Sequence, residues 1–361
     1  GIVSRAVAPR STLPVLGNIL IATDGGRLRF SATNLEMGIT CWVPTEISEE
    51  GAITVPARTI SDLVATLPND KVVLTLDQRS MTLNVRSGQS VTDIKGIDPQ
   101  EFPPMPPVDL EDGIELNVAD FKEMIQQVAF SASADEARPV LQGVLLSLTG
   151  SELVMAATDG FRISIKKSIL SSSPGKTLNV IIPARALSEL GRIVTDGSQT
   201  VSMLMPRDRG QVIFHTKDIE LVSQIIDGNF PDFKAIVPRN FKTRTVTSAA
   251  GLLKACKQAE IIARESNNII RLNILGNQDQ VGTVEVSAQS EETGTNENKV
   301  DATVDGPGLA IAFNVRFLRE VLEVVKSPNI SLETNMNNTP GVIRPLGDEN
   351  YIHVIMPMHM G

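Results

Sequence analysis

Few residues in this chain could carry out acid–base, nucleophilic or metal chemistry. The 361 residues include only these histidines and cysteines: His215, His353, His359, Cys41 and Cys256. No carboxylate–histidine cluster and no Cys-x-x-Cys pair accompanies them, so surface or strand histidines are favoured over metal ligands or general bases. Asp159 is the candidate catalytic carboxylate, but an aspartate directly before a glycine more often forms a turn.

The composition excludes several classes of protein. No Gly-x-Gly-x-x-Gly, P-loop or Gly-x-Ser-x-Gly motif is present, and we expect neither a cofactor nor a metal. The net charge of −9 argues against a generally basic nucleic-acid coat, although a local basic face is allowed. Two cysteines indicate a reducing compartment, and no apolar run approaches the roughly 20 residues that span a bilayer. We therefore expect a cytoplasmic protein.

An internal repeat organises the chain. Four blocks recur in order at offsets of 125 to 128 residues: Val15–Ile21 with Val140–Leu146, Ala32–Asn34 with Ala157–Asp159, Val55–Arg58 with Ile182–Arg185, and Phe102-Pro103 with Phe230-Pro231. In a fainter third copy, Phe313–Arg316 follows Ile182–Arg185 at an offset of 131 residues. The helices predicted after these blocks share an apolar i, i+3, i+7 stripe, which is typical of one buried helix face. The repeat predicts three similar domains.

The predicted domains are residues 1–107, 114–237 and 238–361. A proline-rich stretch at 97–113 and a basic one at 237–245 separate them. Because residues 1–8 already have the pattern of a helix interior, we expect an N-terminal piece to precede Gly1, and the family resemblance described below implies that this piece is a strand and part of the first helix. Residues 290–300 are polar and acidic, which indicates an exposed loop.

Each copy has the predicted order helix, strands, helix, strands. In the second copy we expect helices at 119–131 and 184–194, and strands at 140–148, 153–157, 162–168, 200–205, 211–215 and 219–223. Short alternating strands joined by turns favour antiparallel sheets, so the predicted class is α+β. Residues alone therefore favour a non-catalytic repeat protein that offers a binding surface.

The chain resembles the bacterial DNA polymerase III β subunit family, the sliding clamps. The most specific stretches are Arg10–Asn18, Ala157–Arg162, Ile182–Arg185, Asn229–Phe233 and Met356–Met360. The resemblance covers essentially the whole chain. It implies a homodimeric head-to-tail ring of six domains, with helices inside and sheets outside, that encircles duplex DNA. The implied role is a processivity factor, a non-catalytic subunit of a DNA-directed DNA polymerase (nucleotidyltransferase) holoenzyme.

The resemblance also implies a peptide-binding cleft between domains two and three. Short linear motifs of the replicative polymerase, the clamp loader and repair proteins would dock there. Carried over residue by residue, the cleft is formed by Leu141, Thr158, Gly160, Phe161, Arg162, Ile163, Pro231, Ile236, Asn314, Phe317, Val354, Met356, Pro357 and Met358. Aliphatic side chains and adaptable methionines suit leucine or phenylalanine anchors. Without the resemblance, the methionines alone would indicate an ordinary C-terminal strand.

Two further sets of residues follow from the resemblance. Candidate DNA-facing residues are Arg5, Arg10, Lys122, Arg192, Lys254, Lys257 and Arg319, although basic residues occupy any exposed helix face. Candidate dimer contacts are Thr92 and Ile94 on an edge strand of one chain, against Ile261 and Ile262 on a helix of the other. A recurring arginine, at 58, 185 and 316, favours a structural role at the helix start.

The chain departs from the family pattern at several cleft positions. Phe161 replaces a histidine, Ala235 an arginine and Asn267 an aromatic residue, while His359 and Met360 replace Arg-Leu. We therefore expect a more apolar grip on the peptide. Pro139 and Val140 replace paired tyrosines, and Thr59 replaces a lysine that would form an ion pair at the dimer contact.

Two other functions remain open. One is an enzyme that uses Asp159, and the other is a repeat scaffold that binds proteins without encircling DNA.

Overall fold

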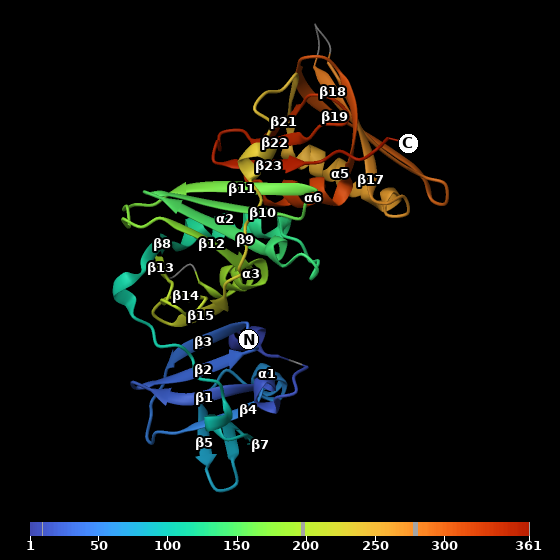
Figure 1. Ribbon diagram of the computed structural model, residues 1–361. Helices are drawn as coiled ribbons and strands as arrows, with labels where there is room; N and C mark the ends of the chain where they lie inside the picture. The colour runs from blue at the N-terminus through green and yellow to red at the C-terminus, as the bar shows by residue number, and fades with distance from the viewer. Residues whose placement is uncertain (9, 196–198, 277–280, 361) are drawn as a thin grey trace. The chain divides into compact units, whose positions relative to one another are not determined.

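The computed structural model describes residues 1–8, 10–195, 199–276 and 281–360. These residues form two compact units (Figure 1). The first unit contains residues 1–121 and 185–225, and the second contains residues 122–184 and 226–361. The chain passes between the units three times: in helix α2 (Val118–Val128), at the start of helix α3 (Ala184–Ile193), and between residues 225 and 226. The second sequence repeat therefore contributes to both units.

The first unit is built on an eight-stranded sheet with the order β4-β1-β2-β3-β15-β14-β13-β8. Strand β3 of the first repeat pairs with β15 of the second, which joins two repeats in one sheet. The strands are β1 (Asn18–Asp24), β2 (Arg27–Thr33), β3 (Met37–Pro44), β4 (Ala52–Pro56), β8 (Ile114–Asn117), β13 (Thr200–Leu204), β14 (Gln211–His215) and β15 (Ile219–Gln224).

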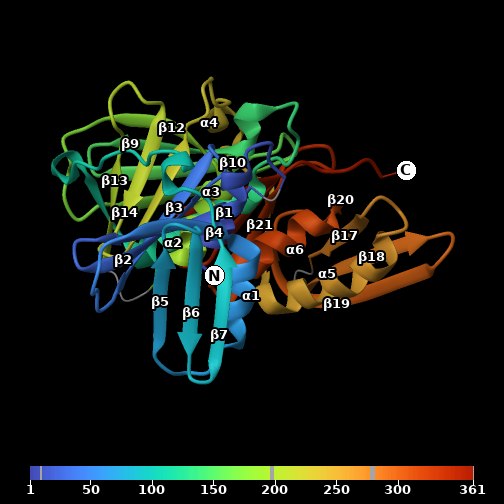
Figure 2. The ribbon, with the colours of Figure 1, turned by 90° about the horizontal axis from the view of Figure 1, so that it is seen from below.

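A separate three-stranded sheet completes the first unit (Figure 2). Its strands are β5 (Val72–Asp77), β6 (Thr82–Ser87) and β7 (Ser90–Lys95), and helix α1 (Ala57–Thr66) precedes them. Within the described residues β7 pairs along one side only, with β6, so it is an edge strand, as the family resemblance implied.

The second unit contains a twelve-stranded sheet with the order β12-β9-β10-β11-β23-β22-β21-β16-β19-β18-β17-β20. Strand β11 of the second repeat pairs with β23 of the third. The strands are β9 (Gly143–Thr149), β10 (Glu152–Thr158), β11 (Arg162–Ile169), β12 (Leu178–Pro183), β16 (Thr243–Ser248), β17 (Ile269–Leu275), β18 (Gly282–Ser290), β19 (Gly294–Asp305), β20 (Leu309–Asn314), β21 (Asn329–Thr334), β22 (Gly341–Pro345) and β23 (Tyr351–Ile355).

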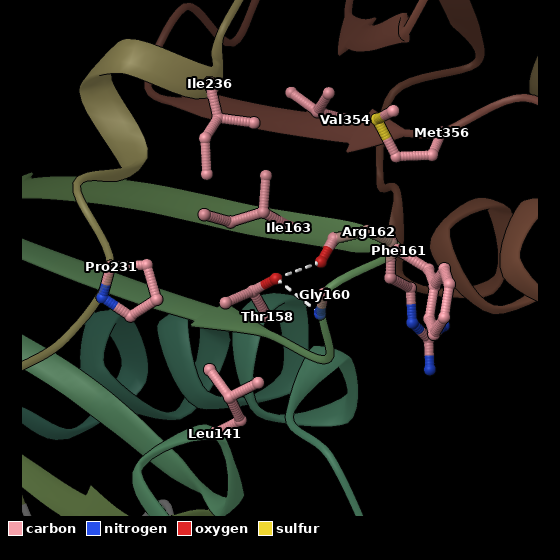
Figure 3. A pocket seen from close by; sticks show the side chains of 10 residues that line it. All are labelled: Leu141, Thr158, Gly160, Phe161, Arg162, Ile163, Pro231, Ile236, Val354 and Met356. Atoms are coloured by element: carbon pink, nitrogen blue, oxygen red, sulfur yellow. Dashed lines mark hydrogen bonds between the residues drawn. The ribbon is translucent and has the colours of Figure 1, made fainter. Parts of the chain in front are cut away.

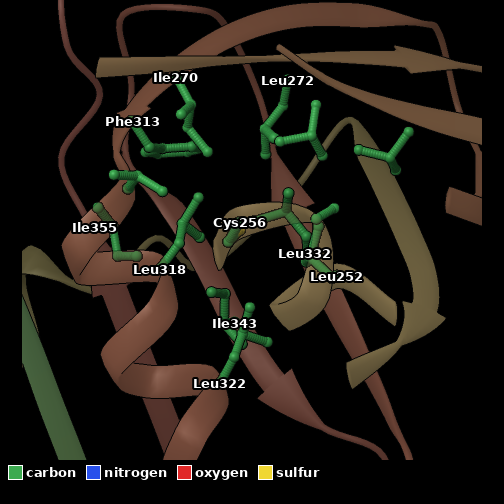
Figure 4. Close-up of a cluster of buried hydrophobic side chains, with 14 of the residues drawn as sticks. Leu252, Cys256, Ile270, Leu272, Phe313, Leu318, Leu322, Leu332, Ile343 and Ile355 are labelled. Carbon is green, nitrogen blue, oxygen red and sulfur yellow. The ribbon is translucent and has the colours of Figure 1, made fainter. Parts of the chain in front are cut away.

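Helices α5 (Ala249–Ala263) and α6 (Val315–Val324) pack against this sheet through an aliphatic core (Figure 4). Each helix starts at a capped residue: Ser248 Oγ accepts from Gly251 N at 3.1 Å, and Asn314 Oδ1 accepts from Arg316 N at 3.0 Å. Cys256 of α5 is fully buried in this core, and burial raises the pKa of its thiol to about 12. The thiol therefore packs as a small apolar group.

The remaining elements are short. Helix α4 spans Phe233–Ile236, and 3-10 helices span Val3–Ala6, Pro14–Gly17, Pro99–Glu101, Leu110–Asp112, Ala129–Ser131 and Pro139–Gln142. Every recorded strand pair is antiparallel, which confirms the predicted α+β class.

Three local expectations were wrong. Residues 290–300 are not a loop but the end of β18, a turn and most of β19, because polar side chains alternate along an exposed strand. Residues 140–142 belong to a 3-10 turn that starts at Pro139, rather than to β9. The helix expected over residues 1–8 is reduced to one 3-10 turn. The recurring arginines at 58, 185 and 316 are exposed, and Arg58 Nε lies 3.8 Å from Asp62 within α1.

Candidate peptide-binding pocket

The turn between β10 and β11 is held by its own side chains (Figure 3). Thr158 Oγ1 donates to Arg162 O and accepts from Gly160 N at 3.1 Å. Asp159 Oδ1 accepts from Phe161 N at 2.9 Å and from Arg162 N at 3.1 Å. Gly160 has a φ of 93°, which favours glycine. Asp159 is thus a turn residue, as the favoured interpretation of the sequence held.

An apolar pocket of about 120 Å³ opens beside this turn. It lies entirely within the second unit, where β11 meets β23. Ten of the fourteen residues predicted for the cleft line it: Leu141, Thr158, Gly160, Phe161, Arg162, Ile163, Pro231, Ile236, Val354 and Met356. Ile163 of β11 and Val354 of β23 are register partners, and both are buried side chains of its lining (Figure 3).

The rim of the pocket consists of exposed apolar side chains. Phe161 is 57% exposed, Ile236 41% and Met356 40%. Exposed large apolar side chains that gather around one concavity are typical of an interaction site. Met356 N donates to Phe161 O at 2.9 Å, so the segment after β23 is fixed to the turn by its main chain.

Arg162 is buried, and each nitrogen of its guanidinium donates a hydrogen bond within the chain. Nε donates to Asp159 at 3.2 Å, Nη1 donates to Glu320 of α6, and Nη2 donates to Phe130 O at 3.1 Å. The rings of Phe317 and Phe130 lie 4.4 and 5.3 Å from the guanidinium carbon. Arg162 therefore supports the pocket wall, and its charge is already compensated.

Four predicted cleft residues lie outside the pocket lining. Phe317 packs over Arg162, and Asn314 caps α6. Met358 N donates to Ala312 O at 2.8 Å, which places the C-terminal segment along β20, and Pro357 precedes it. The four residues thus lie beside Arg162, at the start of α6, or in the C-terminal segment along β20, and not in the pocket lining itself.

A buried polar cluster lies among β11, β23 and the end of α2. Ser164 Oγ is 2.7 Å from both Ser131 Oγ and His353 Nδ1, and Tyr351 Oη donates to Gln127 O at 2.7 Å. The ring of His353 stacks on Phe130. Burial, with the nearby charge of Arg162, lowers the pKa of His353 to about 3. His353 is a core histidine that joins the second and third repeats.

The predicted DNA-facing residues differ in how far their charges are compensated. Arg5 and Arg192 both pair with Glu189, at 3.1 and 2.9 Å. Arg319 pairs with Glu260 at 2.9 Å and Glu323 at 3.1 Å, and Lys257 pairs with Glu323 at 3.3 Å. Arg10 and Lys254 are exposed, and Lys122 is half-buried.

The predicted dimer residues lie at two surfaces. Ile94 is only 3% exposed and Thr92 is half-buried on the same face of β7, so that strand presents its main-chain edge outward. Ile261 is 64% exposed at the end of α5, whereas Ile262 packs partly on the core.

Sequence reasoning missed two residues that shape the pocket. Glu320 pairs with Arg162 across 158 positions, and no local pattern connects them. Arg138 donates to Asp159 O at 3.1 Å and to Asp135 at 3.0 Å, which fixes the loop before β9 against the turn. Its position directly before Pro139, in the block that recurs as Leu13-Pro14, could have drawn attention to it.

Within the described ranges no group of three or more His, Cys, Asp or Glu side chains could hold a metal ion. None of the described helices is long and apolar enough to cross a membrane.

Comparisons with known proteins agree along the whole chain. Three domain models of the DNA polymerase III beta subunit match: the N-terminal domain at residues 1–106, the central domain at 115–232 and the C-terminal domain at 234–359. The beta sliding clamp of Synechococcus elongatus is 33% identical over 99% of this chain and 96% of its own length. That of Staphylococcus epidermidis is 31% identical over 98% and 94%.

Solved structures give the same assignment. The DNA polymerase sliding clamp of Bacillus subtilis superposes with a TM-score of 0.91 at 28% identity, covering 99% of this chain and 95% of the other. The beta subunit of Thermotoga maritima superposes with a TM-score of 0.89 at 27% identity, covering 100% and 96%. With three domain models in order and full-length relatives, this chain belongs to the DNA polymerase III beta subunit family, the beta sliding clamps.

Proposed function

We propose that this protein is a processivity clamp, a head-to-tail homodimer that encircles duplex DNA and tethers a replicative polymerase through the pocket. In this role it performs no catalysis itself and acts as a soluble cytoplasmic subunit of the polymerase holoenzyme. The observation that carries the proposal is the apolar pocket at the junction of the second and third repeats, in a chain built from three clamp domains. We propose domain limits of 1–107, 114–237 and 238–361.

The pocket is suited to an uncharged peptide segment with leucine or phenylalanine anchors. Both arginines beside the pocket are engaged internally, Arg162 by Asp159 and Glu320 and Arg138 by Asp135. A ligand carboxylate would therefore have to compete with the chain's own carboxylates. We expect peptide affinity to depend little on ionic strength.

A charge placed on the pocket rim tests the docking role. Met356→Glu should weaken binding of the polymerase by tenfold or more, since burying one large apolar anchor is worth about 1.5–3 kcal/mol. Processive extension on a primed circular template should fall accordingly. Met336→Glu is the matched control, because Met336 is an exposed methionine in a turn of the same unit outside the pocket lining.

Topological DNA binding is tested separately from docking. Protein loaded on a circular duplex should co-elute with the DNA and should be released when the circle is cut, because an encircling ring slides off a free end. Met356→Glu should leave this retention unchanged. Retention that survives linearisation, or no retention at all, would favour the non-encircling scaffold.

The dimer is supported by two free strand edges. Residues 294–301 of β19 pair only with β18, and β7 pairs only with β6 among the described residues. Joining the β7 edge of one chain to the β19 edge of another would continue a sheet across the contact, with Ile261 beside it. This assignment places the main chain of β7 at the interface, because its Ile94 side chain is buried.

A further inference from the structure

The turn between β2 and β3 in the first unit repeats the pocket turn bond for bond. Thr33 Oγ1 donates to Met37 O at 3.1 Å and accepts from Leu35 N at 3.0 Å. Asn34 Oδ1 accepts from Glu36 N at 3.0 Å and from Met37 N at 2.8 Å. The same four bonds hold residues 158–162 at the pocket.

The neighbouring strand repeats as well. Val222 is the register partner of Gly38, as Val354 is of Ile163. Gln224 N donates to Glu36 O at 2.9 Å, which corresponds to the bond from the residue after β23 to the pocket turn. The first unit therefore contains a second site with the same backbone as the pocket.

Two leucine side chains at this second site are exposed. Leu35 takes the place of Gly160 and keeps a φ of 75°, which is unfavourable for a side chain as large as leucine. It is 53% exposed, and Leu13, which takes the place of Arg138, is 51% exposed. In the second unit these two places are neighbours, since a Cβ on Gly160 would lie 3.2 Å from the Arg138 guanidinium. A strained backbone and exposed leucine side chains are each typical of a binding site.

The floor of the second site is also apolar. A Cβ on Gly38 would lie 2.7 Å from the terminal methyl of Met105, so Met105 occupies the space that the Ile163 side chain fills at the pocket. Met105 and Val108 pack against the cluster that contains Val222. A flexible thioether as floor allows the site to adapt to its occupant.

The rim distinguishes the two sites by charge. The exposed Glu36 stands where the pocket has Phe161, and the exposed Gln224 stands where it has Met356. Within the described residues no ion pair is recorded for Glu36. A cationic side chain next to an apolar anchor would find a partner there.

We infer that the β2–β3 turn is a second docking surface, which takes an extended peptide with an aliphatic anchor beside a lysine or arginine. The inference rests on the proposed function only for the class of ligand, an extended peptide. The two docking sites of one chain would then select different segments, one uncharged and one basic.

The test uses the full-length protein with 13C-labelled leucine methyl groups. The probe is the synthetic peptide acetyl-Ser-Leu-Lys-Leu-Ser-amide, with the Glu analogue in place of Lys as its counterpart. The Lys peptide should shift the methyl signals of Leu13 and Leu35 saturably and more strongly than the Glu peptide does. Leu35→Gly should weaken binding at the Leu13 signal by about tenfold while keeping the fold, because glycine adopts a positive φ without strain.

Charge reversal gives the decisive comparison. Glu36→Lys should exchange the preference, so that the Glu peptide binds more tightly, whereas Glu49→Lys, at an exposed position in the same unit, should change nothing. Unmoved Leu13 and Leu35 signals, or an unchanged preference in Glu36→Lys, would overturn the second site. The signal of Leu141 reports the pocket independently with the uncharged peptide acetyl-Ser-Leu-Gly-Leu-Phe-amide. Its failure to respond would count against the proposed function alone.

Discussion

At the scale of the residue, His353 makes the folded protein sensitive to acid. The folded state holds its imidazole neutral with a pKa of about 3, whereas an unfolded histidine has a pKa of about 6.5. The unfolded chain binds the extra proton between these values, so the stabilisation is complete above pH 6.5 and is lost as the pH falls toward 3. We expect this histidine to lower the free energy of unfolding by up to about 1.4 kcal/mol per pH unit within that window.

Denaturant unfolding at pH 7.5, 6.5, 5.5 and 5.0 measures this contribution. His353→Gln should be less stable than the wild type at pH 7.5, because the ring packs on Phe130, yet its stability should fall less steeply with acid. The exposed His359 provides the control, and His359→Gln should keep the wild-type slope. Equal slopes for all three proteins would mean that His353 does not titrate on unfolding.

The residue scale also shows where sequence reasoning stops. Asp159 could be predicted as a turn residue, because the preference of aspartate before glycine is local. Its second oxygen holds Arg162, and Arg162 reaches Glu320, which depends on how β11 and α6 meet. No spacing in the sequence encodes such a contact, so the compensated charge of the pocket arginine could not be foreseen.

At the scale of the element, apolar periodicity predicted the buried strands and helices well. The strand expected over 211–215 and the helix over 184–194 agree with β14 and α3 to within one residue. Predictions failed where tertiary contacts or exposure replaced the apolar signal. Strand β19 alternates half-buried and exposed polar side chains, so its composition resembled that of a loop. The sequence therefore did not indicate the free edge of β19, on which the proposed dimer depends.

We expect the basic residues of helices α5 and α6 to contribute unequally to DNA binding. Lys254 is exposed and has no recorded ion pair among the described residues, whereas Arg319 is shared by Glu260 and Glu323. Lys254→Ala should weaken retention on duplex DNA and reduce the slope of log affinity against log salt by about one, because one counterion fewer is released. Arg319→Ala should change that slope less and should mainly lower thermal stability, since it leaves Glu260 buried without its cation.

Filter binding of the two variants to a short linear duplex at 20 to 200 mM salt separates these effects. Short linear DNA removes the topological contribution, so the slope reports direct phosphate contacts only. The assignment of Lys254 to the DNA-facing surface would be lost if its variant matched the wild type at every salt concentration.

At the scale of the whole molecule, the repeat explains why the same fold provides both the two docking turns and the free strand edges. Pairing of β3 with β15 and of β11 with β23 joins consecutive repeats through the same register, and each junction carries the same turn. A third junction, between the last repeat of one chain and the first of another, would complete the series. The free edges of β7 and β19 are the strands available for it.

Ile261 offers the cleanest test of that third junction. Ile262 packs partly on the core, so a charge there would also disturb folding, whereas Ile261 is largely exposed in the isolated chain. Ile261→Asp should therefore leave the unfolding transition unchanged and convert the dimer to monomers, because the interface would have to bury an unpaired carboxylate. Light scattering across a dilution series measures the mass.

Val281→Asp, at another exposed aliphatic residue of the same unit, should remain dimeric. A dimer that persists in Ile261→Asp would place the contact elsewhere. A monomeric variant that still supports short extension, but no longer stays on circular DNA, would link the closed ring to processivity.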